Sequence, residues 1–382
     1  MRATGTPRVE WIDAARGVCI VLVSLLHAGL VLSRVYGSEN GVWPEVSDVL
    51  APVRMPLFFF ISGVLASRAV RRPLRSTRRR TLGMYYLYVV WTLLTLVLTG
   101  WWSERSPLEL DLVGRALILP TGIWFLFALA LYFLVAAVAG RLLGSRAGWL
   151  LVPASALAVA APAIDAAGFG DLPQPFGHVF LGSLAAYLVW FLAGVHGRRA
   201  LEWVRAQASW PLVLGGASLF GAATWFALVH GVQAPAALPL SALALPTALA
   251  LFAKVPLRNP LGGLLVVVGR RTLPIYVMQL ILLRVLLLVS APDTGVLWTG
   301  VGEATANIVV PVVAVLMVAI GWWIGWVIER VPILRPLLTA PSWLVGRDRR
   351  VDSNHEDADA SPDLARGIEH HPRPHADRPP QR

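Results

Sequence analysis

About ten segments of this chain are apolar over enough residues to cross a lipid bilayer. A transmembrane helix needs roughly 20 consecutive apolar residues, because the hydrocarbon core is about 30 Å thick and a helix rises about 1.5 Å per residue. Of the 382 residues, 56% are hydrophobic and only 14% are charged, which excludes an ordinary soluble domain. The sequence therefore predicts an all-α, polytopic transmembrane helix bundle. The expected spans are 16–36, 47–67, 81–101, 121–140, 148–164, 179–196, 211–230, 236–253, 268–290 and 304–328.

The arginines predict how these spans are oriented. They gather before the first span and after the second, fourth, sixth, eighth and tenth, whereas the other connections hold aspartate and glutamate. Cytoplasmic connections carry an excess of lysine and arginine. We therefore expect both termini in the cytoplasm and an even number of spans, although eight or twelve would preserve the same alternation. The net charge of +11 then reflects topology in a lipid bilayer and does not require a nucleic-acid partner.

The C-terminal end has a different composition from the rest. Residues 346–382 are polar, mixed in charge and contain proline, so they cannot bury a core. We predict a membrane domain over 1–345 and a disordered cytoplasmic tail over 346–382. The spacing of the tail histidines fits no defined metal site, so no metal is predicted; they are His355, His370, His371 and His375.

The first apolar segment carries two ionisable side chains, Arg16 and His27. Eleven positions make about three helical turns, so the two residues share one helix face, about 16 Å apart along the axis. Ionisable groups within a membrane usually face a protein interior or a water-filled cavity. One interpretation is an arginine that sets topology and a histidine held by packing. The other is a group-transfer site, with His27 as general base or nucleophile. Asp13 lies one turn before Arg16 and is expected to pair with it or to cap the helix, a structural role.

The second apolar segment contains MPLFFFISG. Pro52 and Pro56 are expected to disturb its start, and Gly63 to allow a close approach of another helix. Arg54 lies towards the outer end of this segment. The three phenylalanines 58–60 are equally consistent with a packing or lipid-facing surface.

A run of seven arginines between Arg68 and Arg80 follows the second segment. It is expected to stop translocation and to contact anionic lipid headgroups. Arginine forks also bind phosphate well, so a phosphorylated donor such as coenzyme A is the alternative ligand. Trp124, Tyr276 and His178 are interpreted as packing or interfacial residues. No nucleotide-binding loop, dinucleotide fingerprint, zinc signature or nucleophile elbow is present in the sequence, which argues against an ATP-driven pump.

Several motifs together resemble the integral-membrane acyltransferase family, type 3, and within it the fucose-acetylase-like O-acyltransferases. The specific features are an arginine and a histidine separated by ten residues, and the FFxxSG element within MPLFFFISG. The looser matches are WFLFAL, YLVWFLAG and LPIYVMQ, and together the resemblance covers roughly residues 8–330.

The resemblance implies an enzyme that moves an acyl group, expected to be acetyl, from acyl-CoA to a hydroxyl of a sugar, envelope glycan or related acceptor. It also implies that His27 and Arg16 are catalytic. The donor would be held by Arg16 and by an Arg-x-x-Arg element, matched by Arg68 and Arg71 or, in other registers, by Arg72 and Arg75 or by Arg75 and Arg78. Arginine supplies nearly all the basic residues, which suggests a bacterial protein, and we expect a multi-pass protein of the plasma (inner) membrane.

Two positions depart from the family pattern. Many members have a histidine where this chain has Arg54, and many have another where it has Gln279, so acceptor choice is expected to differ. Two other functions are consistent with the same residues. In a transporter or flippase for a glycan or lipid-linked precursor, Arg16 and His27 would line a permeation path. In a sensory or scaffold protein, both would be replaceable.

Overall fold

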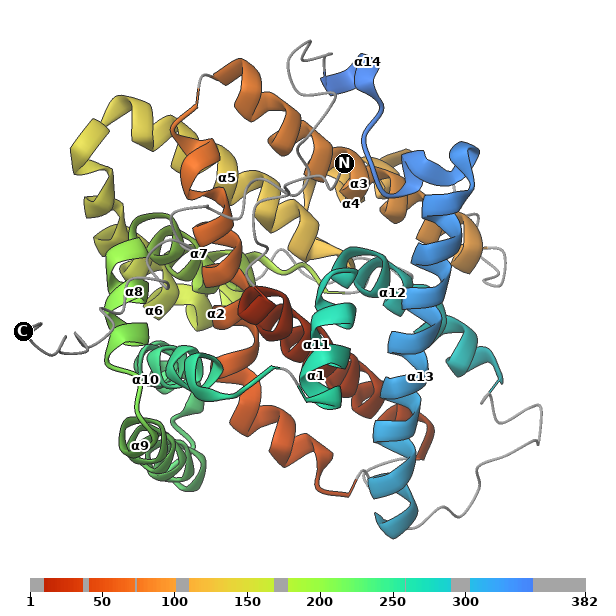
Figure 1. Ribbon diagram of the computed structural model, residues 1–382. Coiled ribbons are helices and arrows are strands. Elements are labelled where there is room, and N and C mark those ends of the chain that lie inside the picture. The colour runs from red at the N-terminus through yellow and green to blue at the C-terminus, as the bar shows by residue number, and fades with distance from the viewer. Residues whose placement is uncertain are drawn as a thin grey trace, which may run out of the picture. The chain divides into compact units, whose positions relative to one another are not determined.

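The computed structural model describes residues 10–36, 41–72, 74–100, 110–167, 178–257, 259–289 and 303–345. It is 89% helical and contains no strand in these ranges, apart from an isolated bridge between Thr121 and Val179. The all-α prediction is therefore confirmed. The helices belong to one compact unit, Trp11–Arg347 (Figure 1). The predicted tail, 346–382, lies outside the described residues, so its disorder stays a prediction.

The described residues form sixteen helical elements in chain order. Their bounds are α1 Glu10–Tyr36, α2 Trp43–Val70, α3 Leu74–Gly100, α4 Leu110–Ile118, α5 Trp124–Leu142, η1 Gly144–Leu150, α6 Leu151–Ala167, α7 Leu181–His196, α8 Arg198–Ala206, α9 Trp210–Val229, α10 Gln233–Lys254, α11 Pro260–Gly269, α12 Thr272–Val289, α13 Glu303–Arg330, η3 Pro332–Leu337 and α14 Ser342–Val345.

Eight helices in the described part of the chain are long and apolar enough to cross a membrane. A ninth candidate is the pair α11 and α12, which is bent by 78° at its break, and α7 is a shorter apolar helix of 16 residues. Together these elements match the ten predicted segments in place. The number of spans and the cytoplasmic position of the termini stay predictions.

Three helices begin well before the apolar segments expected to cross the membrane. Helix α1 begins at Glu10, six residues before its segment, and α3 begins at Leu74, seven residues before its segment. Helix α2 begins at Trp43 and continues through Pro52 and Pro56. A membrane helix tolerates internal proline where neighbouring helices cover the freed backbone groups.

Helices α2 and α7 approach closely through a reciprocal pair of glycines. A Cβ atom on Gly63 would lie 2.1 Å from the carbonyl oxygen of Phe191, and one on Gly194 would lie 2.0 Å from that of Phe60. Small residues permit such backbone contacts, which supply van der Waals packing where lipid removes the hydrophobic driving force between helices. The expectation for Gly63 is confirmed.

Helix α1 makes a similar contact with α11, which lies beside it in Figure 1. A Cβ on Gly17 would lie 2.1 Å from the Leu265 carbonyl oxygen, and one on Gly269 would lie 1.7 Å from that of Asp13. The contact holds the end of α11 against the first half of α1. It therefore places the break between α11 and α12 next to Arg16.

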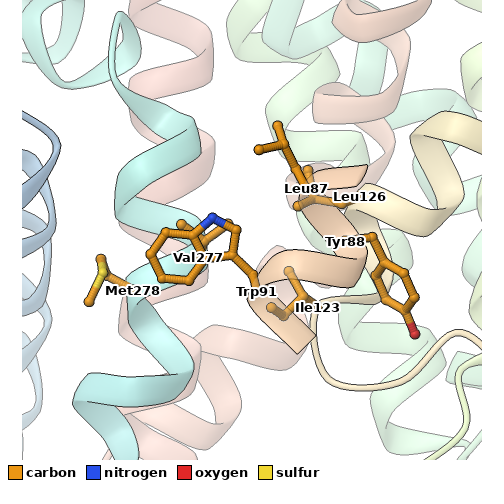
Figure 2. Packing of buried hydrophobic residues seen from close by; sticks show 7 residues of the cluster. All are labelled: Leu87, Tyr88, Trp91, Ile123, Leu126, Val277 and Met278. Atoms are coloured by element: carbon orange, nitrogen blue, oxygen red, sulfur yellow. The ribbon is translucent and has the colours of Figure 1, made fainter. Parts of the chain in front are cut away.

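A buried cluster joins α12 to α3 and α5 (Figure 2). Its polar edges are satisfied, because Trp91 Nε1 donates to the Leu337 carbonyl oxygen at 2.7 Å and the Tyr88 hydroxyl lies 2.6 Å from the Ala116 carbonyl oxygen. The cluster fixes the position of α12 relative to the helices around the candidate site. Its members are Leu87, Tyr88, Trp91, Ile123, Leu126, Val277 and Met278.

Candidate active site

Arg16 and His27 both contact α12. The Arg16 guanidinium donates to Thr272 Oγ1 at 2.7 Å, and His27 Nδ1 lies 2.9 Å from Gln279 Oε1. Thr272 and Gln279 are seven positions apart, which is about two helical turns, so they share one face of α12. Both contacts advance in the same chain direction, so α1 and α12 run parallel here. The two predicted catalytic side chains thus face one neighbouring helix.

Two polar contacts join the break between α11 and α12 to α1, one at Asp13 and one at Arg16. Arg270 lies 3.4 Å from the buried Asp13 carboxylate. Thr272, the first residue of α12, receives the Arg16 hydrogen bond. Asp13 therefore has a structural role, but its ion pair is with Arg270, distant in the chain, which the sequence did not predict, and it lies inside α1 and is not the cap at its start.

A chain of hydrogen bonds determines which nitrogen of His27 carries the proton. The Ser24 hydroxyl donates its hydrogen to the Ile20 carbonyl oxygen at 2.9 Å. Ser24 can then only accept from Gln279, whose Nε2 lies 2.6 Å away. This fixes the orientation of the Gln279 amide, so its oxygen faces His27 and accepts a hydrogen from Nδ1.

The consequence is a lone pair on His27 Nε2. In neutral imidazole one nitrogen donates and the other accepts, so a proton on Nδ1 leaves Nε2 as the base or nucleophile. Ser24 and Gln279 are 0% and 1% exposed, and so the chain is shielded from competing water. Of the hydrogen bonds that the structure describes for His27, the one to Gln279 is the only one formed by its ring.

A cavity of about 240 Å³ extends from Arg16 between α1, α2, α3, α5, α7 and α12. Arg80 also lines it, and the Cζ of Arg80 lies 5.6 Å from the centre of the Phe133 ring. Most of the wall is apolar or aromatic. On α12 the wall runs from Thr272 to Tyr276, one turn short of Gln279. The cavity thus begins at two guanidinium groups and ends one turn of α12 before Gln279, and neither His27 nor Gln279 is among the residues that line it.

Of the other arginines predicted to hold the donor, Arg68, Arg71 and Arg72 have described side chains and do not line this cavity. Arg68 and Arg71 line a separate pocket of about 530 Å³, together with Arg198 and Arg199 of α8. At about 100° per residue, Arg71 lies on the opposite face of α2 from Ser62, which lines the cavity.

Arg72 and Arg75 are two other arginines predicted to bind the donor. Arg72 is exposed, and its carbonyl oxygen accepts a hydrogen bond from Arg141. The side chain of Arg75 lies outside the described residues.

Trp124, Tyr276 and His178, interpreted from the sequence as packing or interfacial residues, lie in three different places. Trp124 stacks on Phe180 and Tyr187, with ring centres 5.5 and 5.8 Å apart, which fits packing. Tyr276 lines the cavity, and its hydroxyl accepts from the Phe125 amide at 3.2 Å, which satisfies the start of α5. His178 is half exposed and lies 4.0 Å from the Asp165 carboxylate.

Sequence reasoning missed several residues of the site. Ser24 had a usable signal, because it lies three positions before His27 on the same helix face. Gln279 was identified only as a departure from a family pattern. Arg80 was not separated from its neighbours. No sequence signal points to Thr272, Arg198 and Arg199, since their contacts arise from the packing of distant helices.

Comparison with protein families gives one match. The model described as "Acyltransferase domain", of the acyltransferase type 3 family, matches residues 9–326. This range includes every described residue of the cavity and of the hydrogen-bond chain on His27. Comparison with curated proteins and with solved structures found no match.

Proposed function

The chain belongs to the type 3 acyltransferase family, and from this premise we propose that it transfers an acyl group, acetyl in the expected case, from acyl-CoA to a hydroxyl of a sugar, envelope glycan or related acceptor. The observation that carries the proposal is the hydrogen-bond chain from Ile20 through Ser24 and Gln279 to His27. It prepares Nε2 as an acceptor of a proton, within the membrane domain of an acyltransferase.

In the proposed reaction, His27 Nε2 accepts the proton of the acceptor hydroxyl. The oxygen attacks the thioester carbonyl, the carbon–sulfur bond breaks, and the departing thiolate takes the proton from the imidazolium. Gln279 keeps the ring in the required tautomer and orientation throughout. Attack by Nε2 itself, with a transient acyl-histidine, uses the same geometry.

The donor enters from the Arg16 side in this proposal. Arg16 and Arg80 would contact its phosphates, because guanidinium groups match phosphate oxygens in charge and geometry. The narrow apolar cavity would hold the pantetheine arm. The basic pocket supports an alternative position for the nucleotide at Arg68 and Arg71. The predicted donor roles of Arg68, Arg71, Arg72 and Arg75 stay predictions. The positive-inside pattern supports a cytoplasmic donor at the plasma membrane.

One observation favours the alternative function, a transporter or flippase. Transporters often bind substrates at broken membrane helices in two repeat-related halves. The α11–α12 pair is such a break, and it is the only one among the described helices. Here the break brings Thr272 to Arg16, which serves an enzyme equally well, and the family favours the acyltransferase.

The test is acetyl transfer from radiolabelled acetyl-CoA in membranes that contain equal amounts of each protein. Wild type is compared with His27→Ala and with the control His230→Ala, an exposed histidine at the end of α9. We expect label in a glycan or small-molecule fraction for wild type and control, and none for His27→Ala. Equal labelling by His27→Ala would contradict the proposal.

A further inference from the structure

Arg54 is a buried cation that the reaction above does not use. It lies within α2 and is 7% exposed. Its NH1 donates to Ser47 Oγ at 3.2 Å, whereas its Nε is buried without a hydrogen-bond partner. No carboxylate in the described ranges lies within ion-pair distance of its guanidinium.

Burying the Arg54 guanidinium in this way is energetically unfavourable unless an anion neutralises it. A buried charge without a counter-ion is strongly unfavourable, and arginine is almost never fully buried unless it is paired. Asp48, the acidic residue whose charge acts on Arg54, is itself exposed and does not pair with it. A guanidinium with unused donors inside a membrane protein is therefore a site for an anion.

The position of Arg54 indicates which substrate supplies the anion. Phe58 lines the cavity of about 240 Å³ that is proposed to hold the donor, called the donor cavity below. Arg54 lies one turn beyond Phe58 on the same face of α2. On α12, Gln279 likewise lies one turn beyond Tyr276. Arg54 and the His27–Gln279 pair are thus both beyond the end of the cavity that starts at Arg16.

Charge interactions support this placement. Arg54 is close enough to His27 and Cys19 on α1 and to Tyr187 on α7 for its charge to act on their ionisation. It therefore belongs to the surroundings of the reacting nitrogen. The donor phosphates, at the other end of the cavity, are too distant to pair with it.

We propose that Arg54 binds an anionic group of the acceptor, a carboxylate or a phosphate, on the side of His27 away from the donor cavity. The inference rests on the proposed acyltransferase function and adds the chemical class of its acceptor. The bound anion would neutralise the Arg54 guanidinium and accept its unused hydrogen bonds. It would also hold the acceptor hydroxyl near His27 Nε2. A neutral acceptor would leave the buried charge unpaired, so it would bind more weakly.

The binding test uses protein purified in detergent and saturated with coenzyme A, which occupies the donor arginines. The probes are glucuronate, glucose 6-phosphate and glucose at constant ionic strength, and the readout is the shift in thermal unfolding temperature. Wild type is compared with Arg54→Gln and with Arg115→Gln, an exposed arginine on α4. We expect at least one anionic probe to stabilise wild type and Arg115→Gln but not Arg54→Gln. Equal shifts in all three proteins, or no shift with either anionic probe, would overturn the proposal.

The activity test uses the labelled product of the transfer assay. Product made by wild type should bind an anion-exchange resin at pH 7, and treatment with alkaline phosphatase would distinguish a phosphate from a carboxylate. Arg54→Gln should raise the acceptor KM about tenfold or more and leave the acetyl-CoA KM unchanged, since a charged hydrogen bond is worth about 1.5–3 kcal/mol. Arg54→Lys should restore part of this loss.

Two further results would contradict the proposal that Arg54 binds an anionic group of the acceptor. A neutral product would overturn the proposal. A lower kcat with an unchanged acceptor KM would also overturn it, because that pattern assigns Arg54 to the transient oxyanion. If wild type transfers no label, the proposed function fails, and the unfolding shifts still decide whether Arg54 binds an anion.

Discussion

Replacing Gln279 with methionine should separate the tautomer of His27 from the packing around it. Methionine has a similar length and shape, so the 1% exposed position stays filled. The change removes the oxygen that accepts the Nδ1 hydrogen at 2.9 Å and the nitrogen that donates to Ser24 at 2.6 Å. Ser24 keeps its bond to Ile20, so α1 should fold as before.

The magnitude follows from the lost hydrogen bond on Nδ1. A buried donor left unsatisfied costs about 1–3 kcal/mol. If that energy no longer favours the tautomer with a free Nε2, the competent fraction falls by about 5- to 150-fold, at about 1.4 kcal/mol per tenfold. We expect kcat to fall within this range and the acetyl-CoA KM to stay unchanged, because the contact between Arg16 and Thr272 is unaffected.

The assay is acetyl transfer at matched amounts of folded protein, with kcat and the donor KM measured separately. Met278→Leu is the matched control, since Met278 is the buried neighbour of Gln279 in the apolar cluster and has no part in the hydrogen-bond chain. Gln279→Glu should retain more activity than Gln279→Met, because a carboxylate oxygen still accepts from Nδ1. An unchanged kcat for Gln279→Met would refute the argument that this chain prepares His27.

The remaining predictions concern the packing and the donor end. Gly63→Ala should lower the thermal unfolding temperature in detergent, because its Cβ would lie 2.1 Å from a backbone oxygen of α7, whereas Gly215→Ala, with no atom within 4 Å, should not. Arg16→Lys should raise the acetyl-CoA KM, because lysine lacks the bidentate fork; an unchanged KM would exclude donor binding there. Thr272→Val should raise the same KM to a smaller extent. Ser24→Ala should reduce kcat by about 2- to 13-fold, equivalent to about 0.5–1.5 kcal/mol for one neutral hydrogen bond, and an unchanged kcat would remove Ser24 from the chain.

The sequence by itself determined the class of fold, and it pointed to Arg16 and His27 as the pair around which the candidate site is built. Apolar segments of about 20 residues can satisfy their backbone groups in lipid only as helices, so their lengths predicted the helices. The eleven-residue separation of Arg16 and His27 predicted a shared face, because a single helix has a fixed geometry. Gly63 was predicted as a contact point for a related reason, since only a residue without a side chain permits backbone contact.

Only the tertiary structure decided which side chains complete the site. Gln279 and Ser24 are 255 positions apart in the chain, and Arg16 and Thr272 are 256 apart. Such pairs depend on the packing of α1 against α11 and α12 and on the break between those two helices, which local periodicity does not encode. The same reasoning explains the arginine run. The sequence showed seven similar cations, but the rotation of α2 and α3 within the bundle decided that Arg80 joins Arg16 while Arg68 and Arg71 face another pocket.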